Sequence, residues 1–269
     1  MVLANGLNHH VQRLSATRRT GAGPAPTMVL VHGILPDSLA SYYFTVGPAF
    51  AAAGLDVIMY DLRGHGRSAR PSTGYRLADF LDDLDALLDV LVARVPVHLV
   101  GNSFGGTVAF GYAERRPERV ASIVLVESTP ATPAWARTMA TVLARAKDQL
   151  PRPEVIAGIT DDYGVYAARL VKRAAGVLWS TSIAEDLPAS DVLPTPQIAA
   201  VVVPTMAIYG GESNLAEQAS WLKWVLPSCT SIVIPGRGHF VLMTEAARSA
   251  ELILGWLQDC GGLNVSSTG

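Results

Sequence analysis

Short apolar segments rich in Val, Ile and Leu alternate with helix-like stretches along most of the chain, and this alternation limits its fold more than any other feature. The apolar segments are residues 28–31, 57–60, 97–100, 123–126, 206–209 and 231–234. Runs that are apolar at every position are typical of strands buried on both faces of a parallel sheet. Strands that alternate with helices predict an α/β fold with a doubly wound, mostly parallel sheet.

The segments between these predicted strands repeat their apolar residues at helical spacing. The expected helices are residues 40–53, 77–95, 104–114, 217–225 and 245–259. Hydrophobic residues make up 49% of the 269 positions, which is enough to build a large core and excludes disorder for most of the chain. We therefore expect one sheet-centred body.

One interval, between residues 126 and 204, interrupts the alternation. Trp135, Met139 and Leu143 recur at helical spacing there, and a second helix is expected over residues 163–179. Several prolines punctuate the interval, which favours short helices joined by turns. We expect a core of residues 1–128 and 200–260, a helical cap or lid at residues 129–199, and a flexible tail at residues 261–269.

The pentapeptide Gly101-Asn102-Ser103-Phe104-Gly105 has the pattern G-x-S-x-G and stands between a buried strand and a helix. In that context the small residues allow a sharp strand-to-helix turn that exposes the Ser103 hydroxyl. The same turn directs the Phe104 N–H toward any oxyanion that forms nearby. The pattern predicts a nucleophilic serine, and the alternative is a turn with a helix-capping serine.

A serine hydroxyl needs a base that accepts its proton, and an imidazole can take and return that proton. His239 is the best of the six histidines because it follows the strand at residues 231–234 and a glycine-rich stretch. His98 lies within a predicted strand and is expected to be a core residue, and His65 lies in the Arg-Gly-His-Gly loop.

Five features, in this order, make the sequence resemble the α/β-hydrolase family. They are His-Gly at 32–33, DLRGHGRS at 61–68, GNSFGG at 101–106, the inserted segment, and GRGHF at 236–240. The resemblance extends over nearly the whole chain and implies the same fold, with Ile34 giving the second oxyanion N–H. His32 is expected to support that loop, and Arg63, His65 and Arg67 to pack beside the site rather than bind an anion.

The acid of the expected triad departs from the family pattern. Relatives usually have Asp three residues after the Gly that closes the penultimate strand, and Ser213 occupies that position here. Two carboxylates can substitute: Glu127, at the end of the strand after the nucleophile, and Glu212. Some dehalogenases and lactone hydrolases of the family resemble the first arrangement. Glu127 is favoured and Glu212 stays open, because the order Ser, Glu, His holds for both.

Charge and cysteine content restrict the other possibilities. The formal net charge is −2 without a long run of either sign, so neither nucleic acid nor an anionic membrane is an expected partner. Two cysteines without metal-ligand spacing and the absence of a long apolar N-terminal run favour a soluble, cytoplasmic protein. The sequence has no dinucleotide, Walker or metal motif, so no cofactor or metal is expected, and it leaves the oligomeric state open.

These observations predict a serine hydrolase that cleaves an ester, lactone or thioester of a fairly hydrophobic small molecule through an acyl-enzyme. Trp135 and Trp179, both in the insertion, are candidate substrate contacts. The alternative reaction is hydrolysis of a carbon–carbon bond in a ring-cleavage product, since GNSFGG resembles the elbow of those hydrolases. A ligand-binding relative with little turnover is the alternative of a different class.

Overall fold

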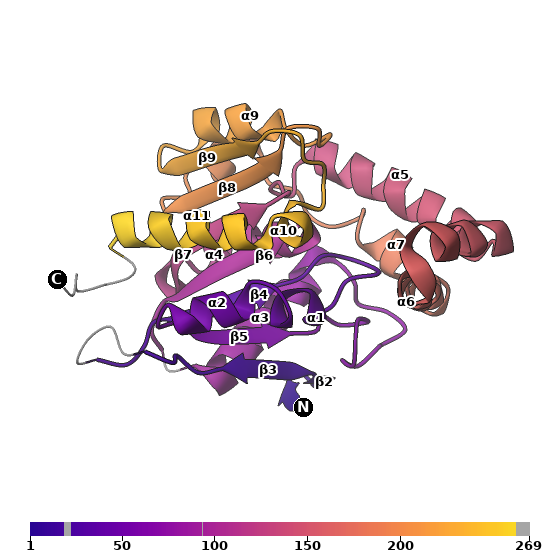
Figure 1. The fold of residues 1–269 in the computed structure, drawn as a ribbon, viewed down its shortest axis with the longest axis horizontal. Coiled ribbons are helices and arrows are strands. Elements are labelled where there is room, and N and C mark those ends of the chain that lie inside the picture. Colours follow the sequence, from indigo (N-terminus) through magenta and orange to yellow (C-terminus); the bar gives the residue numbers. More distant parts are fainter. Residues whose placement is uncertain (19–22, 93, 262–269) are drawn as a thin grey trace.

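The computed structural model describes residues 1–18, 23–92 and 94–261, and a seven-stranded sheet lies at its centre (Figure 1). The strands are β1 (Val2–Ala4), β2 (Leu7–His9), β3 (Val11–Leu14), β4 (Thr27–Val31), β5 (Asp56–Tyr60), β6 (Val97–Asn102), β7 (Val120–Val126), β8 (Thr205–Gly210) and β9 (Cys229–Ile234). The helices are α1 (Ala40–Tyr43), α2 (Gly47–Ala52), α3 (Leu77–Leu91), α4 (Phe104–Arg115), α5 (Pro133–Gln149), α6 (Pro153–Ser180), α7 (Ile183–Asp186), α8 (Thr195–Ala199), α9 (Gln218–Val225), α10 (Val241–Thr244) and α11 (Ala246–Asp259), with a short 3-10 turn at Pro117–Arg119. All but the first residue of the expected flexible tail lie outside the described residues.

The sheet has the order β3-β5-β4-β6-β7-β8-β9. All its neighbouring strands are parallel except β3, which pairs antiparallel with β5 at the edge. The six apolar segments found in the sequence coincide with β4 to β9, so the predicted fold class is confirmed. The chain runs from β4 to β5 on one side and then returns to place β6 on the other side of β4. Ligand sites of open α/β sheets form at such a reversal, beyond the carboxyl ends of the strands.

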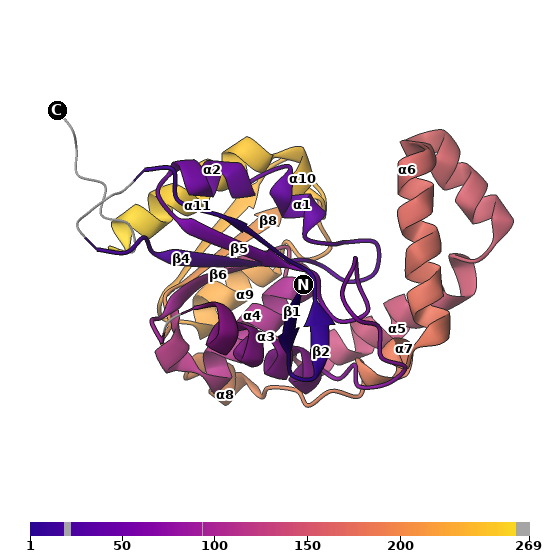
Figure 2. The ribbon, with the colours of Figure 1, turned by 90° about the horizontal axis from the view of Figure 1, so that it is seen from below.

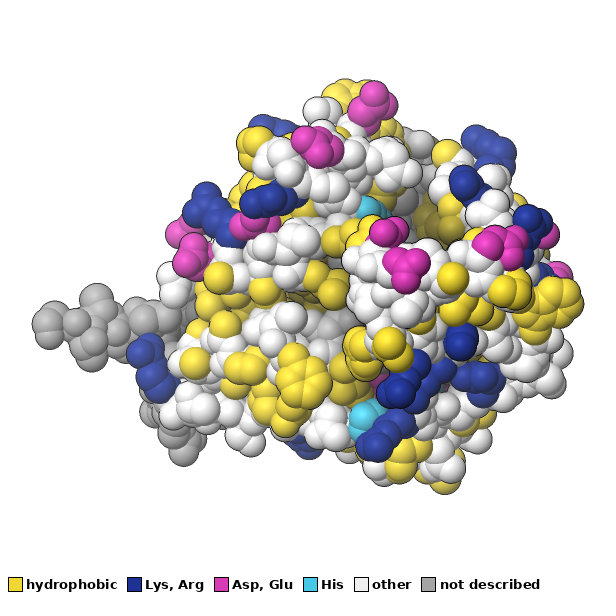
Figure 3. Space-filling model, turned by 45° about the vertical axis from the view of Figure 1, so that its right-hand side comes forward, with side chains coloured by type: hydrophobic (Ala, Val, Ile, Leu, Met, Phe, Trp, Pro, Cys, Tyr) yellow, Lys and Arg dark blue, Asp and Glu magenta, His cyan; other side chains and the backbone are white. Residues whose placement is uncertain are grey.

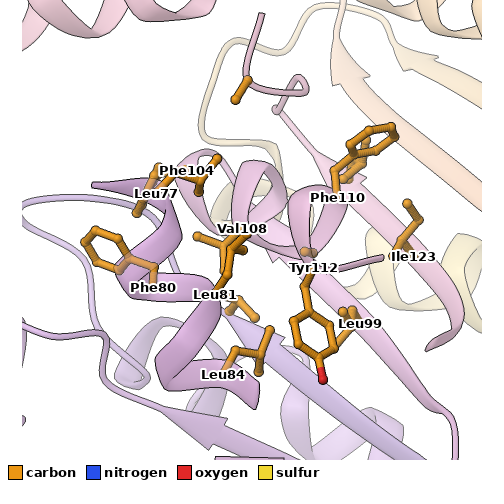
Figure 4. Packing of buried hydrophobic residues seen from close by; sticks show 14 of the residues in the cluster. Leu77, Phe80, Leu81, Leu84, Leu99, Phe104, Val108, Phe110, Tyr112 and Ile123 are labelled. Atoms are coloured by element: carbon orange, nitrogen blue, oxygen red, sulfur yellow. The ribbon is translucent and has the colours of Figure 1, made fainter. Parts of the chain in front are cut away.

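Both faces of the sheet are covered, which explains why its strands lack polar alternation. Along β4, Val29 and Val31 join the core shared with α3, α4 and α9, whereas Met28 and Leu30 join the core shared with α1, α2 and α11. Figure 4 shows how Leu81 and Leu84 of α3 and Val108 of α4 meet in the first of these cores.

The N-terminal strands β1, β2 and β3 carried no sequence prediction. β1 and β2 form a separate antiparallel pair joined at Asn5 and Gly6, both of which have positive φ (48° and 71°). Such torsions are typical of a two-residue hairpin turn. Strands of three or four residues are too short to show an apolar run, so only the turn residues signalled them.

Of the helices expected outside the insertion, two differ from the observed ones, and one of them, expected at residues 77–95, ends at Leu91 in α3. The single helix expected at residues 40–53 is divided into α1 and α2, and Pro48 stands in the first turn of α2. Proline lacks the N–H needed to continue a helix but fits a first turn, so the helix starts again there. The helix expected at residues 245–259 is observed as α11, and the short α10 precedes it.

The insertion, defined as residues 129–199, contains α5 to α8 between β7 and β8. α6 begins at Pro153, earlier than the residue 163 expected, and is broken at Gly164, whose torsions (φ 83°, ψ 169°) are not helical. Figure 2 shows α6 standing away from the sheet. The sequence-based boundaries of core and lid stay a prediction.

Membrane crossing requires a long and uniformly apolar helix. No helix among the described residues meets that requirement.

Candidate active site

Ser103 occupies the sharp turn between β6 and α4. Its backbone has φ 52° and ψ −121°, a conformation that a residue with a side chain adopts only when its surroundings impose it. The N–H of Ser103 donates to the carbonyl of Val126 at 2.8 Å, which ties the turn to the end of β7. The strained turn therefore presents the hydroxyl at the carboxyl edge of the sheet.

Two glycines of the pentapeptide make this turn sterically possible. A Cβ at Gly105 would lie 1.9 Å from the carbonyl oxygen of Val31, and one at Gly101 would lie 2.3 Å from the backbone of Gly105. Both distances are far shorter than any van der Waals contact. Glycine is therefore required at both positions of the G-x-S-x-G pattern, because α4 approaches the backbone of β4 and β6 too closely for a side chain.

His239 and Glu127 complete a hydrogen-bonded chain with Ser103. Nε2 of His239 lies 3.2 Å from Oγ of Ser103, and Nδ1 of His239 lies 3.0 Å from Oε2 of Glu127. An ionised carboxylate accepts hydrogen bonds only, so Nδ1 donates to Glu127 and leaves Nε2 able to accept the hydroxyl proton. The imidazole is 38% exposed, whereas the Glu127 side chain is fully buried.

The buried carboxylate of Glu127 is fully engaged by donors. Oε1 accepts the N–H of Gly210 at 2.5 Å, and Oε2 accepts the hydroxyl of Ser213 at 2.5 Å in addition to the ring of His239. Burial, and to a lesser extent Cys229 and Glu127, raise the pKa of the neighbouring Tyr209. A buried charge is costly unless donors surround it, and here Gly210, Ser213 and His239 surround the carboxylate.

Glu212 lies apart from this chain of hydrogen bonds. Its side chain is exposed, and its backbone N–H donates to the carbonyl of Arg237 at 2.8 Å. The structure therefore brings Ser103, His239 and Glu127 together and does not bring Glu212 to the imidazole.

The His-Gly loop after β4 lies against the turn that carries Ser103, which is called the elbow below. A Cβ at Gly33 would lie 3.4 Å from the Cβ of Ser103, so this backbone borders the hydroxyl closely. Asp37 accepts the N–H of Gly33 at 2.7 Å, and Nδ1 of His32 donates to the carbonyl of Gly33 at 2.6 Å. His32 therefore contacts the loop that it was expected to support.

The two expected oxyanion donors, the backbone N–H groups of Ile34 and Phe104, are available. Ile34 follows Gly33 in the loop beside the elbow, and Phe104 is the first residue of α4. Neither N–H donates to another residue in the described part of the chain. Unpaired N–H groups at a helix start attract negative charge.

His65 holds Leu35, the residue that follows Ile34 in the loop after β4. Its Nε2 accepts the N–H of Leu35 at 2.9 Å, so its Nδ1 carries the proton and donates to the carbonyl of Arg63 at 2.8 Å. Burial, reinforced by the nearby ring of His32, lowers the pKa of His65 to about 4. The imidazole is therefore neutral at pH 7 and serves as an acceptor within the fold.

Arg63 is a packing residue, as expected. Its guanidinium is buried and pairs with Asp83 at 2.5 Å, and it also donates to the carbonyl of Gly74. Among the described residues, no group of three or more His, Cys, Asp or Glu side chains could hold a metal ion.

The two candidate substrate-contacting tryptophans differ in position. Trp135 is buried, and its ring stacks 6.5 Å from that of Phe104, the residue after the nucleophile. Trp179 is 65% exposed, and the ammonium of Lys147 lies 5.7 Å from its ring centre. Trp135 thus adjoins the elbow, whereas Trp179 contacts another part of the insertion.

Ser213 is the site residue whose role the sequence analysis missed. It drew attention only because it stands where relatives carry an acid, and the structure shows it donating to Glu127. That departure from the family pattern was the signal that pointed to it.

Comparisons with known proteins show the family of the chain. A family model described as the alpha/beta hydrolase fold matches residues 26–178, more than half of the chain. A non-heme chloroperoxidase from Streptomyces lividans is 43% identical over 81 residues, which are 30% of this chain and only 29% of that protein. A monoacylglycerol lipase from Mycolicibacterium smegmatis is 29% identical over an alignment of 213 positions that covers 71% of this chain and 71% of that protein.

Among solved structures, the enol-lactonase from Burkholderia xenovorans LB400 superposes with a TM-score of 0.74 at 22% identity, covering 96% of this chain and 99% of that one. At that identity the likeness shows the fold alone. The family model covers more than half of the chain, and its match shows that the chain belongs to the alpha/beta hydrolase fold family.

Proposed function

We propose that the protein is a serine hydrolase that cleaves an ester, lactone or thioester of a fairly hydrophobic small molecule through an acyl-enzyme. The observation that carries this proposal is the chain of hydrogen bonds from Ser103 through His239 to Glu127. It joins a nucleophile, a base and an orienting acid in the order that acyl transfer requires.

In the first half of the reaction, Oγ of Ser103 forms a bond to the carbonyl carbon while Nε2 of His239 takes the hydroxyl proton. The carbonyl π electrons move to its oxygen and give a tetrahedral oxyanion. When that intermediate collapses, the bond to the leaving oxygen or sulfur breaks, and the leaving atom takes the proton back from His239. The acyl group is then held as an ester on Ser103.

In the second half, water attacks the acyl carbon and gives a proton to Nε2 of His239. Collapse of the second tetrahedral intermediate breaks the bond to Ser103, whose oxygen recovers the proton. The products are a carboxylic acid and the free enzyme, and no external electron donor or acceptor takes part.

Glu127 acts through the imidazole and not on the substrate. By accepting the Nδ1–H it fixes the tautomer with a free Nε2, and its charge stabilises the imidazolium that forms in each half-reaction. The donors from Gly210 and Ser213 keep the carboxylate aimed at His239.

The backbone N–H groups of Ile34 and Phe104 are proposed to bind the oxyanion. Their lack of acceptors among the described residues supports this role, because an oxyanion would supply the missing partner. Loss of one such donor costs about 3 to 4 kcal/mol in comparable enzymes. The insertion is proposed to act as the lid over this site.

An active-site-directed fluorophosphonate tests the proposal. We expect the wild-type protein to be labelled and to hydrolyse 4-nitrophenyl butyrate, and Ser103→Ala to do neither. Ser220→Ala, which changes an exposed serine on α9, is the matched control and should behave as the wild type does. Absence of labelling in the wild type, or labelling that survives in Ser103→Ala, would refute the proposal and favour a ligand-binding protein.

A further inference from the structure

A cavity of about 510 Å³ lies between α6 and two loops of the core. One wall is a single face of α6, formed by Tyr166, Leu170, Arg173 and Val177 at helical spacing. The opposite wall is formed mainly by residues of the segments 35–44 and 61–70. This cavity is called the α6 cleft below.

Three arginines line the α6 cleft without a partner. Arg67, Arg70 and Arg173 are exposed, and in the described part of the chain none of their guanidinium groups forms an ion pair or a hydrogen bond. Arginines elsewhere, such as Arg115 and Arg119, pair with aspartates at 2.6 and 2.7 Å. Figure 3 shows Lys and Arg side chains gathered beside a histidine in the lower half of the face it presents.

In the described part of the chain, the acidic side chains of the α6 cleft form no ion pair with these arginines, and their oxygens accept hydrogen bonds from other donors. Asp37 accepts the N–H groups of Gly33 and Ser38 at 2.7 and 2.8 Å, as well as the hydroxyl of Ser41. Asp37 therefore holds its loop in place, and its oxygens do not bind the guanidinium groups.

Asp61 is engaged in the same way. It accepts the N–H groups of Leu39 and Arg67, at 2.9 and 2.8 Å, and the ring Nδ1 of His10 at 2.8 Å. His10 in turn is 3.2 Å from the amide nitrogen of Gln12 through Nε2, so its ring is also committed within the protein.

The loop that borders the α6 cleft also borders the nucleophile. Gly33 lies against Ser103, and Leu35, two residues later, lines the cleft. Two residues of extended chain span at most about 7 Å. Ser103 itself does not line the cleft, but one edge of the cleft lies within about 7 Å, along this loop, of the backbone beside Ser103, a separation that matches a chain of a few carbons.

We propose that the α6 cleft binds an acidic group of the substrate, a carboxylate or a phosphate, through Arg70 and Arg173. Guanidinium groups bind both kinds of group with paired hydrogen bonds. The two arginines approach the cleft from the core and from the insertion, since a Cβ at Gly176 of α6 would lie 3.8 Å from Nη1 of Arg70. The inference rests on the proposed function and specifies its substrate: an apolar chain that carries an ester-type bond near one end and an acidic group at the other.

Three 4-nitrophenyl esters of matched length test this inference: the hexanoate, the monoester of adipic acid, and the ester of 5-phosphonooxypentanoic acid. We expect the wild type to show a kcat/KM at least about tenfold higher for one of the two acidic esters than for the neutral hexanoate. The acidic ester that is favoured identifies the carboxylate or the phosphate. Equal or lower values for both acidic esters would overturn the inference.

Arg70→Gln and Arg173→Gln should each lower the ratio of kcat/KM for the acidic ester to that for hexanoate by about five- to tenfold. Arg145→Gln removes an exposed arginine of α5 that does not line the cleft and should leave the ratio unchanged. A ratio that falls equally in all three variants reflects net charge alone and would contradict the site.

The two proposals fail in different ways. If the wild type cleaves hexanoate without preferring an acidic ester, the proposed function stands and the inference fails. If it cleaves none of the esters, the proposed function fails, and calorimetric titration with adipate and with pentyl phosphate tests the α6 cleft alone. Binding that is weakened in Arg70→Gln and Arg173→Gln supports the cleft, and absence of binding refutes it.

Discussion

The hydroxyl of Ser213 donates to Oε2 of Glu127, the same oxygen that accepts the Nδ1–H of His239. Ser213 lies three residues after Gly210, the last residue of β8, whereas Glu127 directly follows the last residue of β7. The two strands are parallel neighbours, so their ends meet at one edge of the sheet. A serine at the usual acid position thus supports a carboxylate that comes from the adjacent strand.

Replacing the acid distinguishes the two carboxylates. Glu127→Gln removes the charge that stabilises the imidazolium and should lower kcat for 4-nitrophenyl butyrate at least about 100-fold, in line with the loss seen when a triad acid is neutralised. Glu212→Gln should stay within about tenfold of the wild type, because its side chain is exposed. The reverse order of the two effects would assign the acid to Glu212.

Ser213 is a positioning residue in this arrangement, and its hydroxyl can be tested separately. Ser213→Ala should lower kcat by about three- to tenfold with little change in KM, since hydrogen bonds to charged groups contribute about 1.5 kcal/mol or more. Ser213→Thr keeps a hydroxyl and should recover most of the loss. A threonine variant as impaired as the alanine variant would mean that the effect is steric.

Gly105 and Gly158 should respond to alanine in opposite directions. A Cβ at Gly105 would lie 1.9 Å from the Val31 carbonyl oxygen, so Gly105→Ala should lower the free energy of unfolding by about 3 kcal/mol or abolish folding. Gly158 lies in α6 with open space around it, and Gly158→Ala should raise stability by up to about 1 kcal/mol. Urea unfolding midpoints measure both effects, and a Gly105→Ala variant as stable as the wild type would contradict the packing described here.

Stability should fall in mild acid because of His65. Its pKa is about 4 in the folded protein and 6.5 in the unfolded chain. Between these pH values the unfolded chain binds a proton that the folded protein does not, so the free energy of unfolding decreases as pH falls from 6.5 toward 4. The shift corresponds to a loss on the order of 3 kcal/mol.

Urea titrations at pH 7 and pH 4.5 measure this loss. His65→Gln keeps an acceptor for the Leu35 N–H without the titrating group, so its stability should depend less on pH than that of the wild type. The pKa of His9 is lowered as well, chiefly by burial, and its contribution remains in both proteins. An equal pH dependence of the two proteins would rule out His65 as the source.

The strands of the sheet could be predicted because each is buried on both faces and therefore apolar throughout, as Met28 and Val29 illustrate on opposite faces of β4. The short N-terminal strands could not, because three or four residues carry too little pattern. The division between α1 and α2 depended on Pro48, which the apolar spacing alone does not reveal.

The pairing of Ser103 with His239 could be anticipated because both follow the carboxyl ends of strands in one parallel sheet. The sequence favoured Glu127 but left Glu212 open, because both carboxylates follow adjacent strands in the correct order. A local torsion separates them: Glu127 has φ 51° and is buried toward His239, whereas Glu212 remains at the surface. The α6 cleft was missed because its arginines come from segments more than 100 residues apart in the chain.

The break at Gly164 divides α6 into two helical segments, and only the second of them lines the α6 cleft. All four α6 residues that line the cleft follow the break, and the chain beyond them is anchored to the core where the N–H of Ser182 donates to the carbonyl of Ser72 at 2.9 Å. The helical segment before the break, residues 153–163, contributes no residue to the cleft. Insertions, deletions or substitutions in residues 153–163 are therefore expected to leave the arginines and apolar side chains of the cleft in place.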